Sequence, residues 1–137
     1  LSNVSLPGRV TDELPLYYRA ADVLLIPGRG GIVMSEAMAF GVPVIVHQAD
    51  GSEYDLVRDH VTGIRLAKGN LQEVRDAIVL LAQNRLLCEQ MSRQCKIFIR
   101  NRFTTENMVT QIVKAAQFAR RRKAGCIDGG RALDRAA

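Results

Sequence analysis

The stretch from Ile26 to Val46, which reads IPGRGGIVMSEAMAFGVPVIV, limits the possible folds of this chain more than any other segment. It runs from the end of one predicted strand through a glycine turn and an apolar helix to a second predicted strand. Both strands are short, continuous apolar runs, a pattern typical of parallel strands that are covered on both faces. The stretch is therefore predicted to form one βαβ unit of a parallel sheet.

Glu36 is the only ionisable side chain between Gly30 and Val46, and it lies in a helix that is otherwise apolar nearly all round. A helix of that composition is buried, and burying an unpaired carboxylate is strongly unfavourable. We therefore expect Glu36 to lie at an accessible edge of the helix or beside a partner.

The rest of the chain continues the alternation of strands and helices and then becomes entirely helical. Residues 4–10 are predicted to form the end of one strand and a turn, and further strands are predicted at residues 23–27, 42–46 and 62–66. This order predicts an α/β fold with a doubly wound, Rossmann-like parallel sheet of about four strands and C-terminal helices. Residues 1–70 are expected to form the α/β part, residues 71–123 the C-terminal helices of the same domain, and residues 124–137 a disordered tail.

Composition narrows the class of protein. The 137 residues, 47% of them hydrophobic, suit one globular domain or a piece of a larger one. No apolar run approaches the ~20 residues of a membrane span, so a cytoplasmic protein is expected. Cys88, Cys95 and Cys126 are odd in number and lack metal-ligand spacing, so we expect free thiols and no metal site.

The formal net charge of +5 raises the question of an anionic partner. Only 5% of the residues are aromatic, and they are not interleaved with basic residues, so no platform for stacking nucleic-acid bases is expected. Much of the excess charge lies in the segment FARRRKAG, residues 118–125. A peripheral contact with an anionic membrane is one use for such a segment, and an ordinary solvated helix end is the other.

In sheets of this kind, ligands bind beyond the carboxyl ends of the strands. Three turns are expected to meet that edge: Gly8–Thr11, Gly28–Gly31 and His47–Ser52. A glycine turn before a helix leaves backbone N–H groups available to an anion such as phosphate. The alternative is that the glycines only bring helix and strand close together.

Glu36 lies roughly 6 Å along the axis of that helix from its start. An ionised carboxylate can accept two charge-assisted hydrogen bonds from a pair of vicinal hydroxyls. Phosphate at the amides and ribose at Glu36 would together describe a nucleoside diphosphate.

The segment LPLYYRAADVLLIPGRGGIVMSEAMAFGVPVIV, followed by DGSEYDLVRDHVTGIRL, resembles the nucleotide-sugar-binding domain of GT-B glycosyltransferases. The resemblance is to the large, retaining, family-4-like group 1, and it covers residues 4–66 and, more loosely, the helices to Phe103. AADVLLIP, SEAMAFGVPVI and TGI occur in the family's order and spacing. The resemblance implies a retaining, metal-independent hexosyltransferase of polysaccharide or glycolipid biosynthesis, with a nucleotide-diphosphate sugar as donor and no separate cofactor.

The resemblance also assigns residues. Glu36 matches the second Glu of the family's E-x7-E motif, which binds the nucleotide ribose. The backbone before this helix is similar to the segment that contacts the diphosphate and the sugar: Gly30, Gly31 and Ile32. The first Glu of the motif would fall at Gly28, so a carboxylate that holds donor-sugar hydroxyls in many relatives is missing. Sugar contacts are then expected from backbone amides or from Arg29.

Two further turns acquire roles from the same resemblance. The turn that usually lies against the base is matched by Gly8, Arg9 and Val10. Asp50 to Glu53 look like the acidic turn after the next strand, and His47 at the end of that strand is a further candidate. The acceptor-binding domain and the phosphate-clamping Arg and Lys are expected upstream of Leu1, so no catalytic residue is assigned here and this chain alone is not expected to turn over.

Two alternatives stay open at this point. A non-catalytic nucleotide-binding or interaction module of the same fold would explain why the first motif carboxylate is absent. A sugar-nucleotide epimerase or a phosphorylase of similar two-domain build would share the nucleotide site but yield a different product.

Overall fold

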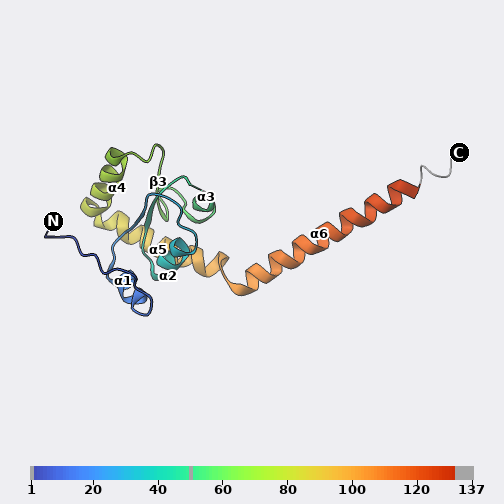
Figure 1. Cartoon of the computed structure of the whole chain (residues 1–137), viewed down its shortest axis with the longest axis horizontal. Helices are drawn as coiled ribbons and strands as arrows, with labels where there is room; N and C mark the ends of the chain where they lie inside the picture. Colours follow the sequence, from blue (N-terminus) through green and yellow to red (C-terminus); the bar gives the residue numbers. More distant parts are fainter. Residues whose placement is uncertain (1, 50, 132–137) are drawn as a thin grey trace. The chain divides into compact units, whose positions relative to one another are not determined.

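The structure, a computed structural model, describes residues 2–49 and 51–131. The elements follow one another along the chain in this order: α1 (Leu14–Ala20), β1 (Leu24–Ile26), α2 (Ile32–Phe40), β2 (Val44–His47), α3 (Ser52–Leu56), β3 (Gly63–Leu66), α4 (Leu71–Gln83), α5 (Arg85–Arg102) and α6 (Thr105–Arg131). The helices and β3 are labelled in Figure 1. The chain forms two compact units, one that reaches to Asn101 and one that begins at Arg102. Each unit is described by itself.

The sheet of the first unit consists of three parallel strands in the order β1-β2-β3. Leu24 of β1 lies opposite Val44 of β2, and Val44 lies opposite Gly63 of β3. Helices α2 and α3 form the connections between the strands, as parallel pairing requires. The predicted α/β fold with a parallel sheet is confirmed, with three strands in the residues that the structure describes rather than about four.

The strand predicted within residues 4–10 is absent. Residues 4–8 have no regular secondary structure, and Leu6 is 91% exposed. A strand is stable only beside a neighbour that accepts and donates its backbone hydrogen bonds. Within the described part of the chain, β1 pairs only with β2, so residues 4–8 have no strand as a partner.

The core lies on both faces of β2, whose successive residues point to opposite sides of the sheet. Val44 and Val46 share a buried cluster with residues of α2, α3 and α5: Met34, Met38, Leu56, Cys95 and Phe98. Ile45 shares a second buried cluster with residues of α4 and α5: Ala77, Leu81 and Met91. Helices α2 and α4 therefore cover opposite faces of the sheet, which is the predicted doubly wound arrangement.

A hydrogen bond from a thiol attaches α5 to the turn before β3. The Cys95 Sγ–H donates to the carbonyl oxygen of Thr62 at 3.0 Å, and both residues are buried. Burial raises the pKa of the Cys95 thiol to about 12, so it remains a protonated donor. Cys88 and Cys95 are free thiols, as expected, and Cys126 lies beyond the side chains that the structure describes.

The helices after β3 follow the predicted order. The side chain of Asn70 caps α4, and Thr104 caps α6 by accepting a hydrogen bond from the Asn107 N–H at 3.1 Å. The end of α6 was predicted near Arg122, but its backbone stays helical to Arg131, because extending a formed helix avoids the cost of nucleation. The disorder expected for the tail, residues 124–137, stays a prediction, and residues 132–137 lie outside the described part. No helix in the described ranges is both long and apolar enough to span a membrane.

Candidate functional site

The turns after β1 and β2 meet at the same edge of the sheet, because these strands are parallel neighbours. The turn after β1 leads directly into α2, whose N-cap is Gly31 with φ of 54°. Glycine has no side chain that could cap the helix, and the first turn of α2 carries no acidic residue. The start of α2 therefore combines uncapped backbone N–H groups with the positive end of the helix dipole, which attracts anions.

The glycines of this turn differ in what surrounds them. A Cβ atom at Gly30 would lie 2.8 Å from Cγ of Met34 and 3.0 Å from Cδ1 of Ile26. A Cβ atom at Gly28 would contact nothing within 4 Å, and Gly28 has no left-handed φ. Close packing of helix and strand thus explains why position 30 is a glycine, but it does not explain the glycine at position 28. Arg29 between them is exposed.

Glu36 lies in the second turn of α2 and is half-buried, at an edge of the helix. The Tyr18 hydroxyl of α1 donates a hydrogen bond to Glu36 Oε2 at 3.3 Å. The sequence predicted that Glu36 lies at an accessible edge of the helix or beside a partner, and both are confirmed. The contact leaves the second carboxylate oxygen, Oε1, outside the pair.

Tyr18 is the site residue that sequence reasoning missed. It is 7% exposed, and burial, with a further contribution from the charge of Glu36, raises the pKa of its hydroxyl. A signal was present, because Tyr18 follows Leu14 at helical spacing and a buried tyrosine hydroxyl usually has a hydrogen-bond partner.

His47 ends β2 and lies beside the turn after β3. Gly69 in that turn has φ of 64°, and a Cβ atom there would lie 2.6 Å from Cγ of the His47 ring. The turn is held by Glu73 Oε2, which accepts hydrogen bonds from the N–H groups of Lys68 and Gly69 at 2.8 and 2.9 Å. The His47 ring is therefore packed against a fixed backbone at the carboxyl edge of the sheet.

Glu53 has contacts that explain much of its burial. The side chain is 2% exposed, and its two oxygens accept hydrogen bonds from the N–H groups of Ala49 at 2.9 Å and Gly51 at 3.1 Å. The carboxylate thus fixes the backbone of the turn after β2. Asp50, the other candidate in this turn, lies outside the described residues.

The third predicted turn, Gly8 to Val10, does not follow a strand. Gly8 has φ of 74°, Gly8 and Arg9 are exposed, and Val10 is half-buried. Because the strand predicted before this turn is absent, sheet topology does not carry residues 8–10 to the carboxyl edge. Their predicted position at a strand end is wrong.

Two cavities lie at opposite ends of the sheet. One of about 340 Å³ lies beyond the carboxyl ends of β2 and β3, with Gln48, Tyr54 and Ala67 in its lining. The guanidinium of Arg65 lies 4.9 Å from the centre of the Tyr54 ring in this cavity. It is therefore on the same side of the sheet as the predicted site.

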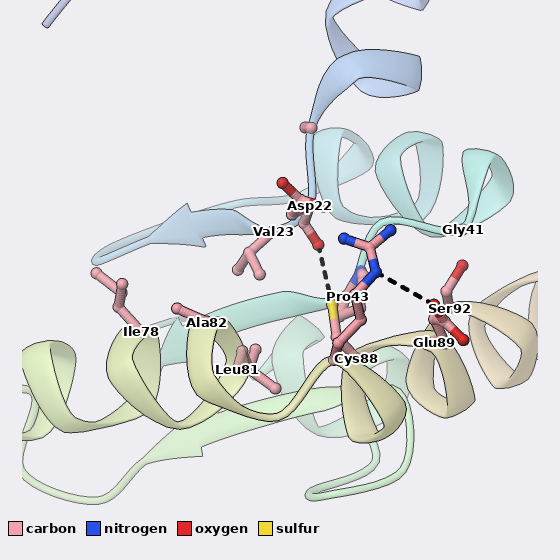
Figure 2. A pocket seen from close by; sticks show the side chains of 12 residues that line it. Asp22, Val23, Gly41, Pro43, Ile78, Leu81, Ala82, Cys88, Glu89 and Ser92 are labelled. Atoms are coloured by element: carbon pink, nitrogen blue, oxygen red, sulfur yellow. Dashed lines mark hydrogen bonds and ion pairs between the residues drawn. The ribbon is translucent and has the colours of Figure 1, made fainter. Parts of the chain in front are cut away.

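The other cavity, of about 500 Å³, lies near the amino ends of β1 and β2, where Asp22, Val23 and Pro43 line it together with α4 and α5 (Figure 2). The Cys88 thiol there donates to the Asp22 carbonyl at 3.5 Å, as the dashed line in Figure 2 marks. Burial and the charge of Asp22 raise the Cys88 pKa, which opposes nucleophilic reactivity. We assign the candidate site to the carboxyl edge, although this cavity is the larger.

No three His, Cys, Asp or Glu side chains of residues 2–49 and 51–122 are grouped so that they could hold a metal ion.

Comparison with known sequences identifies the family. The family model described as Glycosyl transferases group 1 matches residues 1–98. A GDP-mannose-dependent alpha-(1-6)-phosphatidylinositol monomannoside mannosyltransferase of Mycobacterium tuberculosis is 36% identical over 88 residues, which are 57% of this chain and 23% of that protein. A D-inositol 3-phosphate glycosyltransferase of Salinispora arenicola is 42% identical over 62 residues, which are 43% of this chain and 14% of that protein. The chain spans less than a third of each of these relatives.

Solved structures support the fold. Sucrose-phosphate synthase from Thermosynechococcus elongatus has a TM-score of 0.72 at 23% identity, over 90% of this chain and 31% of that chain. It is a likeness of fold, and it agrees with the GT-B resemblance. With the family match over residues 1–98, these observations show that the chain belongs to the group 1 glycosyl transferases.

Proposed function

We propose that this chain is the donor-binding part of a retaining, metal-independent glycosyltransferase, which moves a hexose from a nucleotide-diphosphate sugar to an acceptor in the cytoplasm. In such a transfer the bond between the anomeric carbon and the diphosphate breaks, and a new bond to the acceptor oxygen forms. The diphosphate leaves with the electron pair of the broken bond, and the acceptor hydroxyl loses its proton.

The observation that carries the proposal is the position of Glu36 on α2. Its half-buried carboxylate has Oε2 next to the Tyr18 hydroxyl, and the uncapped start of the same helix follows the glycine turn. Oε1 can accept hydrogen bonds from ribose hydroxyls, because an ionised carboxylate has several acceptor sites. A diphosphate at the start of α2 would then lie within one or two helical turns of the ribose.

The other candidate residues of this turn are proposed to contact the diphosphate and the sugar of the donor. The backbone of Gly30, Gly31 and Ile32 can donate to the diphosphate, and the exposed Arg29 can pair with its charge. Among the relatives, the mannosyltransferase is described as GDP-mannose-dependent, and an Anabaena protein of the same fold, HepE, was solved in complex with UDP. These descriptions support a nucleotide-sugar donor here.

The rest of the transferase is proposed to lie in the part of the relatives that this chain does not cover. An acceptor-binding domain would complete the cleft in which the oxocarbenium-like transition state is stabilised by positioning and electrostatics. We expect no transfer from this chain alone for that reason.

The test is a thermal-shift screen of the full-length protein against ADP, GDP, UDP and their hexose conjugates. A ligand that binds only the folded state must raise the melting temperature. We expect one base to stabilise the protein, and we expect its sugar conjugate to be converted in a product assay with acceptor extracts. Stabilisation by none of the nucleotides would contradict the proposal.

A second candidate is a non-catalytic nucleotide-binding module of the same fold. The open space at Gly28 favours it, since a motif carboxylate would fit there and is nevertheless absent. Nucleotide binding without transfer by the full-length protein would favour this candidate. An epimerase or a phosphorylase would be recognised in the same assay by a rearranged nucleotide sugar or a sugar phosphate.

We further propose a peripheral contact between α6 and an anionic membrane. Exposed apolar residues lie at helical spacing on this helix: Met108, Val109, Ile112 and Val113. Arg120, Arg121 and Arg122 follow them, and each can contribute ~1 kcal/mol at an anionic surface. The full-length protein should sediment with vesicles that contain phosphatidylglycerol, and less so after replacement of the three arginines by serine. Equal sedimentation of both proteins would contradict this contact.

A further inference from the structure

We propose that Tyr18 is a positioning residue, whose hydroxyl orients the carboxylate of Glu36 toward the ribose of the donor. This inference rests on the proposed function and adds to it a residue of α1, a helix that precedes the βαβ unit of the site. It also gives the Tyr18–Glu36 contact a role beyond joining two helices.

The Tyr18 ring is fixed by its surroundings. It is buried in a cluster with Ala37 of α2 and Val42, and its centre lies 5.5 Å from that of the Phe40 ring. A ring held in this way has little rotational freedom, so its hydroxyl oxygen has a defined position. From that position it donates to Glu36 Oε2 at 3.3 Å.

The carboxylate of Glu36 gains its orientation from this contact. A half-exposed glutamate side chain otherwise samples several rotamers, and binding a ligand must pay for fixing one of them. A hydrogen bond to one oxygen restricts rotation and leaves the other oxygen available to the ribose hydroxyls. Preorganisation of this kind increases affinity without adding a contact to the ligand.

The contact also persists over the working range of pH. Burial and the negative charge of Glu36 raise the pKa of the Tyr18 hydroxyl, so the hydroxyl keeps the proton that it donates. Apolar packing between α1 and α2 is already supplied by the ring and its cluster. The hydroxyl itself is therefore not needed for that packing, and its removal can be tested separately.

The variant Tyr18→Phe removes only the hydroxyl, and Tyr17→Phe is the matched control because Tyr17 is 46% exposed on the same helix. The full-length protein is titrated with the ribonucleoside diphosphate that binds best among ADP, GDP and UDP, and with its 2′,3′-dideoxy counterpart. The dissociation constant of the dideoxy nucleotide, divided by that of the ribonucleotide, measures how well the ribose hydroxyls are recognised. We expect Tyr18→Phe to reduce this ratio about 2- to 10-fold, as loss of one hydrogen bond predicts, and Tyr17→Phe to leave it unchanged.

The Glu36→Ala background distinguishes a positioning role of Tyr18 from a purely structural one. If Tyr18 acts through Glu36, the double variant Tyr18→Phe/Glu36→Ala should have the same ratio as Glu36→Ala. A normal ratio in Tyr18→Phe, with a reduced ratio in Glu36→Ala, would overturn the role of Tyr18 and leave the proposed function intact. A loss of affinity in Tyr18→Phe that is equal for both nucleotides would also overturn the role of Tyr18. A normal ratio in Glu36→Ala, or no binding by the parent protein, would overturn the ribose site and the inference with it.

A second measurement uses no ligand. The phenolate absorbance of the protein, titrated with alkali, reports its three tyrosines, Tyr17, Tyr18 and Tyr54. Replacing Glu36 by Gln should lower the pKa of Tyr18 in this titration, because Glu36 contributes to raising it. An unchanged titration curve would contradict the contact on which the inference rests.

Discussion

Gly30 lies so close to Met34 that a Cβ atom added to the glycine would come within 2.8 Å of the methionine Cγ. Met34 is 1% exposed and packs with Val44 and Val46 in the core, so it has little room to move away. The glycine turn and the buried face of α2 are therefore one packing unit.

We accordingly predict different results at the two glycines of this turn. Gly30→Ala should lower the free energy of unfolding by about 1–3 kcal/mol, the range for overpacking a core. Gly28→Ala, the matched control, should change it by less than about 0.5 kcal/mol, since a Cβ atom there contacts nothing within 4 Å. Urea denaturation measures both values. Equal destabilisation by the two substitutions would contradict the packing described for Gly30.

The open position at Gly28 can also accept a carboxylate. Gly28→Glu should leave stability within about 0.5 kcal/mol of the parent protein. It should also strengthen binding of a nucleotide sugar relative to the free nucleoside diphosphate, because a carboxylate beside the turn can accept hydrogen bonds from sugar hydroxyls. Calorimetric titration with both ligands gives the ratio of the affinity for the nucleotide sugar to that for the nucleoside diphosphate. Gly28→Gln is the control for side-chain size. An unchanged ratio in Gly28→Glu would show that this position does not reach the sugar.

We predict that the Glu53 side chain stabilises the turn after β2. Replacing it by Ala leaves the N–H groups of Ala49 and Gly51 without their acceptors, which predicts a loss of about 1–3 kcal/mol in the free energy of unfolding. Glu53→Gln keeps one carbonyl acceptor and should lose less. Hydrogen exchange should report faster exchange at the amides of 49 and 51 in Glu53→Ala. Protection equal to that of the parent protein would contradict these hydrogen bonds.

The Cys95 thiol predicts a pH dependence of stability. Its folded-state pKa of about 12 lies above its value in the unfolded chain, so its contribution is fully present below about pH 8.5 and is lost as the pH rises toward 12. From about pH 9 upward the free energy of unfolding should fall by up to about 1.4 kcal/mol per pH unit from this group. Cys95→Ser keeps a donor to Thr62 that does not titrate there, and its stability should fall less steeply. Parallel pH profiles for the two proteins would rule out this contribution.

Sequence patterns predicted the parts of the fold that depend on local order. The continuous apolar runs of β1 and β2 and the apolar α2 between them are features of short segments, and the parallel sheet follows from their alternation. The strand predicted at residues 4–10 failed because pairing is not local. A run of suitable residues becomes a strand only where another strand lies beside it.

For the site, sequence patterns predicted residues but not contacts. The environment of Glu36 was foreseen from its lone charge, yet its partner comes from α1, 18 residues earlier. The glycines of the turn after β1 cannot be distinguished from the sequence, although packing constrains Gly30 and leaves open space at Gly28. The buried contacts of Glu53 depend on the exact path of the turn after β2, which no periodicity encodes.

The central claim, that Glu36 holds the ribose of a nucleotide donor, is tested most directly by ribose discrimination in Glu36 variants. The measurement, in the full-length protein, is the dissociation constant of the 2′,3′-dideoxynucleoside diphosphate divided by that of its best-bound ribonucleoside counterpart. In Glu36→Ala the ratio should fall about 10- to 100-fold, as expected for the loss of hydrogen bonds to a charged group. Glu36→Gln should fall between the parent protein and Glu36→Ala. The same ratio in Glu36→Ala as in the parent protein would contradict the claim.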